Sequence, residues 1–335
     1  MIPETRPYYR ARIAGTGSYL PTKLLSNSDL EKLVDTDDAW IVERTGIKNR
    51  HVAAPDQVTS DLALIAAQKA IEAAGITATD LDAILVATVS PDQLMPTAAC
   101  VLQRKLGARD CMAVDLSAAC SGFLYALSMA NEFIAGGVYK HVLVVGAEIL
   151  TRYVNYKDRD TCILFGDGAG AFVMSRNTTE DDSKIYSHHL HADGKISDLF
   201  EMPMGGSGYP YTHENLDKGL HFMRMKGREV FKNAVRTMSQ CCSEALEHNK
   251  MQGSDVDWVV PHQANIRIIE GVAKHFGIPM TKVINEIENM GNTSAATVPI
   301  AFDRAVRDNR IRRGQNIMLT AFGAGITSGS LLLRY

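Results

Sequence analysis

Short apolar runs alternate along most of the chain with segments in which apolar residues recur at helical spacing. Runs of four or five residues, rich in Val, Ile and Ala, predict buried strands at 12–15, 83–87, 112–115, 141–145 and 170–174. Between the first two, the pattern predicts a helix over about 61–74, with Thr59 or Ser60 as its cap and Gly75 as its end. Strands that alternate with helices in this way indicate an α/β fold.

The second half of the chain repeats the order of patterns found in the first half. The matching pairs of segments are 81–87 with 256–261, 106–107 with 276–277, 113–120 with 284–292, and 141–145 with 315–320. This alignment places Asn292 in the second half where Cys120 stands in the first. It predicts two similar α/β halves, 1–176 and 177–335, with a site where equivalent loops meet. Residues 177–217 break the pattern and predict an insertion or a lid.

Composition and charge describe an ordinary globular chain. Of its 335 residues, 46% are hydrophobic and 22% charged, and the formal net charge is −3. This charge gives no reason to expect nucleic acid or an anionic membrane surface as a partner. No apolar run approaches the roughly 20 residues of a membrane-spanning helix, and the first residues lack the apolar core of a secretory signal. We therefore expect a cytoplasmic protein.

The cysteines and histidines do not form a metal-binding pattern. None of the six cysteines stands in Cys-x-x-Cys spacing, which favours reduced thiols over a disulfide framework. The segment His188-His189-Leu190-His191 has no cysteine pair nearby in the sequence, so we interpret it as an exposed or half-exposed strand. We expect no bound metal.

Cys120 is the strongest candidate for a reactive side chain. It follows a buried strand in Asp115-Leu-Ser-Ala-Ala-Cys-Ser-Gly122 and opens a predicted helix that stops at Gly136-Gly137. A strand–turn–helix junction exposes a nucleophile, and the helix N-terminus is expected to lower the pKa of the thiol. The alternative is a buried, inert cysteine, which we accept for the other five cysteines.

Two further polar residues stand among small or apolar neighbours. His262 follows the predicted strand 256–260, and ligands gather at the carboxyl ends of such strands; hydrogen bonding within the loop is the alternative. Asn292 lies in Gly291-Asn-Thr-Ser-Ala-Ala296, where an N-terminal helix cap is the alternative. A thiol, an imidazole and a carboxamide can together hold an acyl thioester and stabilise a negative charge beside it. The combination points to carbon–carbon bond formation on a cysteine-bound acyl group.

These three motifs resemble the active-site motifs of the β-ketoacyl-[acyl-carrier-protein] synthase III family. The stretches 35–47, 165–170 and 321–325 support the resemblance, which runs from about Arg12 to Tyr335. It implies a thiolase-like fold, in which two pseudo-repeated halves form αβαβα layers, and a homodimer. The N-terminal half would carry the nucleophile, and the C-terminal half His262 and Asn292. The implied function is decarboxylating condensation of an acyl-coenzyme A primer, by default acetyl-coenzyme A, with malonyl-acyl carrier protein, which starts type II fatty-acid synthesis.

The resemblance also implies catalytic roles. Cys120 would take the acyl group, and His262 and Asn292 would donate hydrogen bonds to the malonyl thioester oxygen after CO₂ is lost. The backbone N–H groups of Cys120 and Ala324 would form the oxyanion hole. No cofactor is implied, because acyl-coenzyme A is a substrate.

Substrate and partner contacts are implied in the same way. Trp40, Arg44 and Arg159 match positions that hold coenzyme A, and Phe165 and Met95 match positions of the acyl tunnel, Met95 reaching it across the dimer. For the acidic acyl carrier protein, Arg224, Arg228, Lys232 and Arg236 would form a basic ridge if they share a helix. The family positions proposed to dock this partner are Lys232, Arg267 and Lys274.

The pattern departs from the family at two sites, and other functions stay open. Ser328 stands where many relatives have Trp, and Met95 where they often have Phe. A related synthase of secondary metabolism, or an acyltransferase with another primer or acceptor, is the main alternative. Thiolase itself lacks a clear second catalytic cysteine here, and a non-catalytic scaffold that binds the carrier protein would not need Cys120.

Overall fold

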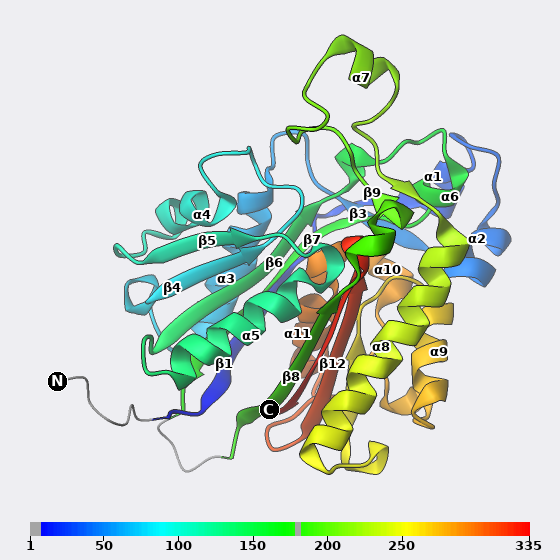
Figure 1. Cartoon of the computed structure of the whole chain (residues 1–335). Coiled ribbons are helices and arrows are strands. Elements are labelled where there is room, and N and C mark those ends of the chain that lie inside the picture. The colour runs from blue at the N-terminus through cyan, green and yellow to red at the C-terminus, as the bar shows by residue number, and fades with distance from the viewer. Residues whose placement is uncertain (1–7, 178–181) are drawn as a thin grey trace.

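A five-stranded sheet forms the core of the first half. The computed structural model describes residues 8–177 and 182–335 (Figure 1). The strands lie in the order β1-β7-β6-β4-β5, with β4 parallel to β5 and β6, and β7 antiparallel to β6 and β1. Their bounds are β1 (Ala11–Tyr19), β4 (Ala83–Ala87), β5 (Met112–Leu116), β6 (His141–Ile149) and β7 (Asp167–Arg176). All five strands predicted from apolar runs are confirmed.

A second sheet repeats this arrangement with the last strands of the chain. Its order is β11-β12-β13-β8, with β11 parallel to β12 and the other neighbours antiparallel. The bounds are β8 (Lys184–Ala192), β11 (Trp258–Pro261), β12 (Asn316–Gly323) and β13 (Thr327–Arg334). Thus β8, β13, β12 and β11 correspond to β1, β7, β6 and β4. A single parallel bridge from Val259 to Val283 stands where β4 pairs with β5.

Residues 177–217 are predicted to form an insertion or a lid, and this prediction is wrong for the part that forms β8. This strand pairs with β13 along its length and is the counterpart of β1. Its sequence, with three histidines in four positions at 188–191, lacks the apolar character of the other strands. Residues 178–181 lie outside the described range, and the division of the chain at 176/177 stays a prediction.

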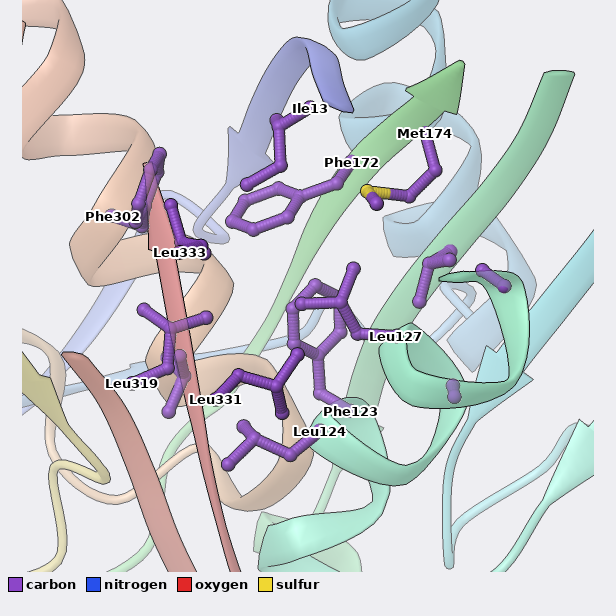
Figure 2. Close-up of a cluster of buried hydrophobic side chains, with 14 of the residues drawn as sticks. Ile13, Phe123, Leu124, Leu127, Phe172, Met174, Phe302, Leu319, Leu331 and Leu333 are labelled. Carbon is purple, nitrogen blue, oxygen red and sulfur yellow. The ribbon is translucent and has the colours of Figure 1, made fainter. Parts of the chain in front are cut away.

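Alternation along the strands sends side chains to two different cores. On β6, Val142 and Val144 face the central core, whereas Leu143, Val145 and Ala147 face the outer one. The central core also contains the apolar faces of α5 (Gly122–Ala135) and α11 (Thr297–Arg307) and of the second sheet. Figure 2 shows this cluster, in which the ring of Phe172 lies between Phe123 and Phe302, with centroids 5.0 and 4.9 Å away.

Helices cover the outer faces of both sheets. On the first sheet, α3 (Thr59–Ala74) and α4 (Ala98–Leu106) pack against the outer core. On the second, α8 (Gly227–Asn249) and α9 (Ile266–His275) do the same. Figure 1 shows the five layers in sequence, with α5 and α11 between the sheets. The predicted αβαβα arrangement is confirmed.

The remaining elements lie around the ends of the sheets. The short strands β2 and β3 pair with each other, and so do β9 and β10. The helix α7 lies in a segment that projects from the body (Figure 1). Their bounds are β2 (Lys23–Ser26), α1 (Asn27–Leu30), α2 (Asp38–Thr45), β3 (Asn49–Val52), α6 (Arg159–Cys162), β9 (Phe200–Glu201), α7 (His213–Asp217), β10 (Arg224–Met225) and α10 (Ile287–Met290). In the described part of the chain, no helix is long and apolar enough to cross a bilayer.

The ends of α3 show how local sequence sets a boundary. Gly75 ends the helix in the left-handed region, at φ 66°, as predicted. The predicted cap is wrong: Val58 is the N-cap, and the Asp61 carboxylate accepts its backbone N–H at 2.9 Å. Thr59 and Ser60 instead lie buried inside the first turn, where their hydroxyls bond Ser90 and Asp92.

Two glycines allow the halves to approach each other. A Cβ on Gly146, in β6, would lie 2.4 Å from the Ala295 carbonyl oxygen in the second half. A Cβ on Gly323, at the end of β12, would lie 2.6 Å from the backbone nitrogen of Cys120 in the first half. Gly146 and Gly323 belong to the equivalent strands β6 and β12, so the two contacts mirror each other.

We predict that Gly146→Ala destabilises the protein because backbone atoms cannot yield to the added methyl group. Overpacking of this kind costs about 1–3 kcal/mol of unfolding free energy, measured by urea denaturation. Gly206→Ala is the matched control, since nothing lies within 4 Å of its Cβ position. Equal unfolding free energies for the two variants would contradict this close contact.

Candidate active site

The three candidate residues converge on one cavity between the halves. Cys120, His262 and Asn292 line it together with Phe165 and Gly323. The first comes from the turn before α5, the second from the end of β11, and the third from the loop between α10 and α11. Their exposed fractions are 4, 2 and 5%. Loops from both halves thus meet at one cavity, and its role as the functional site stays a prediction.

Cys120 lies in a short 3₁₀ turn, Ala119–Ser121, that precedes α5. The turn is sharp: Ala119 adopts φ 46°, in the left-handed region. Burial raises the pKa of the Cys120 thiol to about 12, and a hydrogen bond from the Ser294 hydroxyl only partly opposes this. The predicted lowering of the pKa is therefore wrong, because loss of water around the buried thiol is the largest effect on it.

The second half contains the same turn, but in a different register from the sequence alignment. Ser294, at φ 51°, opens the 3₁₀ turn Ser294–Ala296 before α11, as Ala119 opens the turn before α5. This correspondence pairs Cys120 with Ala295. The predicted equivalence of Cys120 with Asn292 is thus displaced by three positions. Both residues still reach one cavity because the two turns face each other.

His262 is held as a neutral imidazole. Burial lowers the pKa of its ring to about 3. Its Nδ1 lies 2.6 Å from the Thr297 hydroxyl oxygen, and its backbone N–H donates to the Thr320 carbonyl at 2.7 Å. The Thr297 hydroxyl also donates to the Ser294 carbonyl at 3.0 Å. The tautomer with the ring proton on Nε2 arises when this hydroxyl turns to donate to Nδ1 instead.

Asn292 is oriented by its own loop. Its side-chain oxygen accepts the backbone N–H of Ser294 at 2.8 Å, which leaves the amide NH₂ group as a donor. Its backbone bonds Leu164 and Gly166, on either side of Phe165. The N-cap alternative does not hold, because Thr293 is the N-cap of the following turn.

Glu148 is a buried carboxyl beside this site that the sequence reasoning missed. It is 0% exposed and accepts hydrogen bonds from the Val89 N–H at 3.1 Å and the hydroxyls of Ser90 at 2.5 Å and Thr88 at 3.2 Å. Burial raises the pKa of this carboxyl to about 7. A single acidic residue in the apolar strand His141–Ile149 was the available signal.

A surface depression leads to the cavity. Trp40, Arg44, Arg228 and Arg267 line it, and it shares Leu164, Met225, Phe231 and Asn265 with the walls around Cys120. The guanidinium groups of Arg44 and Arg159 each lie 4.6 Å from the centroid of the Trp40 ring. Arg159 of α6 thus lies beside Trp40 and Arg44 of α2, from which it is far away in the sequence, as the resemblance requires.

A second cavity opens on another side of Cys120. Its walls include Phe165, Phe200, Leu94 and Ala324, and Phe165 belongs to both cavities. Met95, predicted to line the tunnel from a partner subunit, is 83% exposed and lines neither cavity in the single chain.

The predicted docking residues lie on neighbouring helices. Lys232, on α8, and Arg267 and Lys274, on α9, are all exposed. The four-residue basic ridge is partly wrong: Arg224 belongs to β10, and only Arg228, Lys232 and Arg236 share α8.

The histidine segment forms the predicted strand β8. The structure also brings Cys241 and Glu244 of α8 close to His191, with the three donor atoms within 4.8 Å of one another. His191 Nε2 lies 2.6 Å from the Glu244 carboxylate, and Cys241 bonds the buried Ser328 hydroxyl at 3.6 Å. Ser328, the departure from the family pattern, thus packs against a cysteine of α8.

Comparisons with known proteins agree with this geometry. Residues 114–194 match the family described as 3-oxoacyl-[acyl-carrier-protein (ACP)] synthase III, and residues 246–335 match its C-terminal part. The chain is 51% identical to the β-ketoacyl-[acyl-carrier-protein] synthase III of Methylococcus capsulatus over 97% of this chain and 99% of that protein. The corresponding protein of Xanthomonas campestris is 52% identical, over 97 and 98%.

Solved structures show the same fold. The 3-oxoacyl-[acyl-carrier-protein] synthase III of Aquifex aeolicus superimposes with a TM-score of 0.90 at 45% identity, covering 97% of this chain and 100% of that one. The priming β-ketosynthase of the R1128 polyketide pathway gives a TM-score of 0.90 at 33% identity, with 99% of each chain covered. The thiolase-like fold predicted from the motifs is confirmed.

We predict that Glu148 makes stability depend on pH between about 4.5 and 7. Its folded pKa, about 7, lies above the ordinary 4.5, so the folded state binds the proton more tightly and stability falls as pH rises through this window. A difference of this size corresponds to about 3 kcal/mol of unfolding free energy. In urea denaturation, the unfolding free energy of Glu148→Gln should rise relative to that of wild type by up to this amount as the pH increases from 5 to 8. Glu247→Gln, which replaces an exposed carboxyl, serves as the control. If the unfolding free energies of wild type and Glu148→Gln changed with pH in parallel, the raised pKa of Glu148 would be refuted.

Proposed function

The chain belongs to the β-ketoacyl-[acyl-carrier-protein] synthase III family, and on that premise we propose how its residues perform the family's reaction. The enzyme is an acyltransferase that condenses an acyl-coenzyme A primer with malonyl-acyl carrier protein and so initiates type II fatty-acid synthesis. Acetyl-coenzyme A is the proposed primer. The convergence of Cys120, His262 and Asn292 on one cavity carries this assignment.

In the first stage, Cys120 attacks the thioester carbonyl of the primer. The sulfur forms a new thioester, and coenzyme A leaves as the thiol. We propose that the backbone N–H groups of Cys120 and Ala324 stabilise the oxyanion of the tetrahedral intermediate. Both residues line the second cavity, and Gly323 lets the end of β12 lie directly against the Cys120 amide.

In the second stage, loss of CO₂ from the malonyl group produces an enolate that attacks the acyl group on Cys120. We propose that His262 Nε2–H and the Asn292 NH₂ group donate to the enolate oxygen. The neutral state of His262 suits a donor that must not hand over its proton. The bonds to Thr297 and Ser294 fix the two side chains in the required orientation.

The route of the primer follows from the surface depression. We propose that Trp40 and Arg159 hold the adenine of coenzyme A and that Arg44 pairs with its phosphate groups, since planar guanidinium groups suit both stacking and bidentate phosphate binding. The pantetheine arm would then pass Leu164 and Phe231 to reach Cys120. Phe165, between the two cavities, would limit the acyl group.

Further parts of the proposal concern partners. Acyl carrier protein is acidic, and Lys232, Arg267 and Lys274 offer it positive charge beside the same depression. A homodimer would give the exposed Met95 an apolar site in the tunnel of the partner. We also propose a cytoplasmic location. No cofactor is needed, because the thioester activates the primer and decarboxylation supplies the carbanion.

The alternatives gain no support. Identity to synthase III relatives is 51–52%, against 33% to the priming synthase of a polyketide pathway. Thiolase chemistry needs a second cysteine, and Cys120 is the one cysteine that lines either cavity within the described residues.

We predict that His262→Ala separates the two stages. Acylation of Cys120 by radiolabelled acetyl-coenzyme A should persist, whereas release of CO₂ from malonyl-acyl carrier protein should fall by about 10²–10³-fold, the usual cost of losing one oxyanion donor. The control is His275→Ala, which replaces an exposed histidine on α9. Normal condensation by the His262→Ala enzyme would refute the role assigned to this residue.

A further inference from the structure

The proposed reaction leaves one proton without an acceptor. Cys120 must lose its thiol proton when its sulfur attacks the primer, and burial makes that proton hard to remove. His262 is a poor acceptor, because burial also disfavours its protonated form. The inference that follows rests on the proposed function and concerns the group that takes this proton.

Strand β6 aims Glu148 at the turn beside the nucleophile. Gly146 and Glu148 stand two positions apart on this strand and so share one face. The backbone of Gly146 lies directly against Ala295, as the 2.4 Å contact of a Cβ placed there shows. The Glu148 carboxyl is therefore directed toward the neighbouring residue of the same turn, Ser294.

Ser294 lies between the carboxyl and the thiol. Ser294 lines the second cavity together with Cys120. The same cavity is lined by Thr88 and Val89, which donate hydrogen bonds to the Glu148 carboxyl. The Ser294 hydroxyl lowers the pKa of both the Cys120 thiol and the Glu148 carboxyl, so it stands close enough to act on each of them. The bond from its backbone N–H to Asn292 fixes the residue in place.

We propose that Glu148 accepts the proton of Cys120 through the hydroxyl of Ser294. As the Cys120 sulfur bonds to the primer carbonyl, its proton passes to Ser294 Oγ, and the Ser294 proton passes to Glu148. When the carbon–sulfur bond to coenzyme A breaks, the proton returns by the same path, and coenzyme A leaves as the thiol. In the second stage, CO₂ leaves as a neutral molecule, and the negative charge of the malonyl carboxylate passes through the enolate to the departing Cys120 thiolate. This thiolate then takes up one proton.

The ionisation of the three groups supports this assignment. The pKa of Glu148 is about 7, against about 12 for Cys120 and about 3 for His262. A general base works best with a pKa close to the working pH. Asp115 and Glu201 also line the second cavity, but the Asp115 carboxylate accepts the N–H groups of Ala98 and Ala99, and Glu201 is exposed. Of the groups behind it, burial raises the pKa of Tyr153, and the Asp167 carboxylate is occupied by the N–H groups of Ala53 and Thr151.

The test is the single-turnover acylation of Cys120 by acetyl-coenzyme A between pH 5 and 9. In wild type, the rate should rise with an inflection near pH 7, the pKa of Glu148. In Glu148→Gln this inflection should disappear, and the rate at pH 8 should fall by about 10²–10⁴-fold, the usual contribution of a general base. Ser294→Ala should lower the rate to a similar extent, because it breaks the path.

A second measurement separates this role from a structural one. Glu148→Asp keeps a carboxyl and should retain an inflection, at a reduced rate. Decarboxylation of malonyl-acyl carrier protein should fall far less than acylation in Glu148→Gln, because that step removes no thiol proton. An unchanged pH profile in Glu148→Gln, or an equal loss of both steps in all three variants, would overturn the proposal. Absence of acylation in wild type would instead refute the proposed function.

Discussion

The close contact between the backbones of the two halves is the constraint on which the site depends. Gly323, at the end of β12, leaves no space for a side chain beside the Cys120 amide, and Gly146, in β6, does the same beside Ala295. The second sheet thus lies against the turn that carries Cys120, and the first sheet lies against the equivalent turn of the second half. As a result, polar groups from both halves share one enclosed space. Any separation of the halves would open this space to water and move Cys120 away from His262 and Asn292.

Enclosure determines the charge state of every group in that space. Loss of water raises the pKa of the Cys120 thiol and lowers that of His262, so both are neutral near pH 7. It raises the pKa of the Glu148 carboxyl only to about 7, where this group can still exchange a proton. A neutral imidazole and a neutral amide can donate hydrogen bonds without neutralising the charge that develops. The same enclosure makes the thiol a weak nucleophile unless a base lies beside it, which is the function we assign to Glu148.

Most of the fold could be predicted from the sequence, and the errors have physical causes. Buried strands such as β4 and β6 are apolar on both faces, so their pattern is clear. The histidines of β8 indicate a half-exposed strand, but without an apolar pattern they do not show that it belongs to the second sheet, so the sequence predicts an insertion there. The motifs identified Cys120, His262 and Asn292, but the register between the halves depends on the positive-φ turn, which no residue type specifies. Only the family resemblance predicts that Trp40 and Arg159 lie together, because contacts between helices as far apart in the sequence as α2 and α6 leave no local pattern.

The most direct test of the central claim is mass spectrometry of the intact protein after incubation with acetyl-coenzyme A, followed by mapping of the modified peptide. The account predicts one added acetyl group, on the peptide that contains Cys120, and none on the five other cysteines. A Cys120→Ala protein should gain no mass. Acetylation at another residue, or no adduct with any acyl-coenzyme A, would contradict the account.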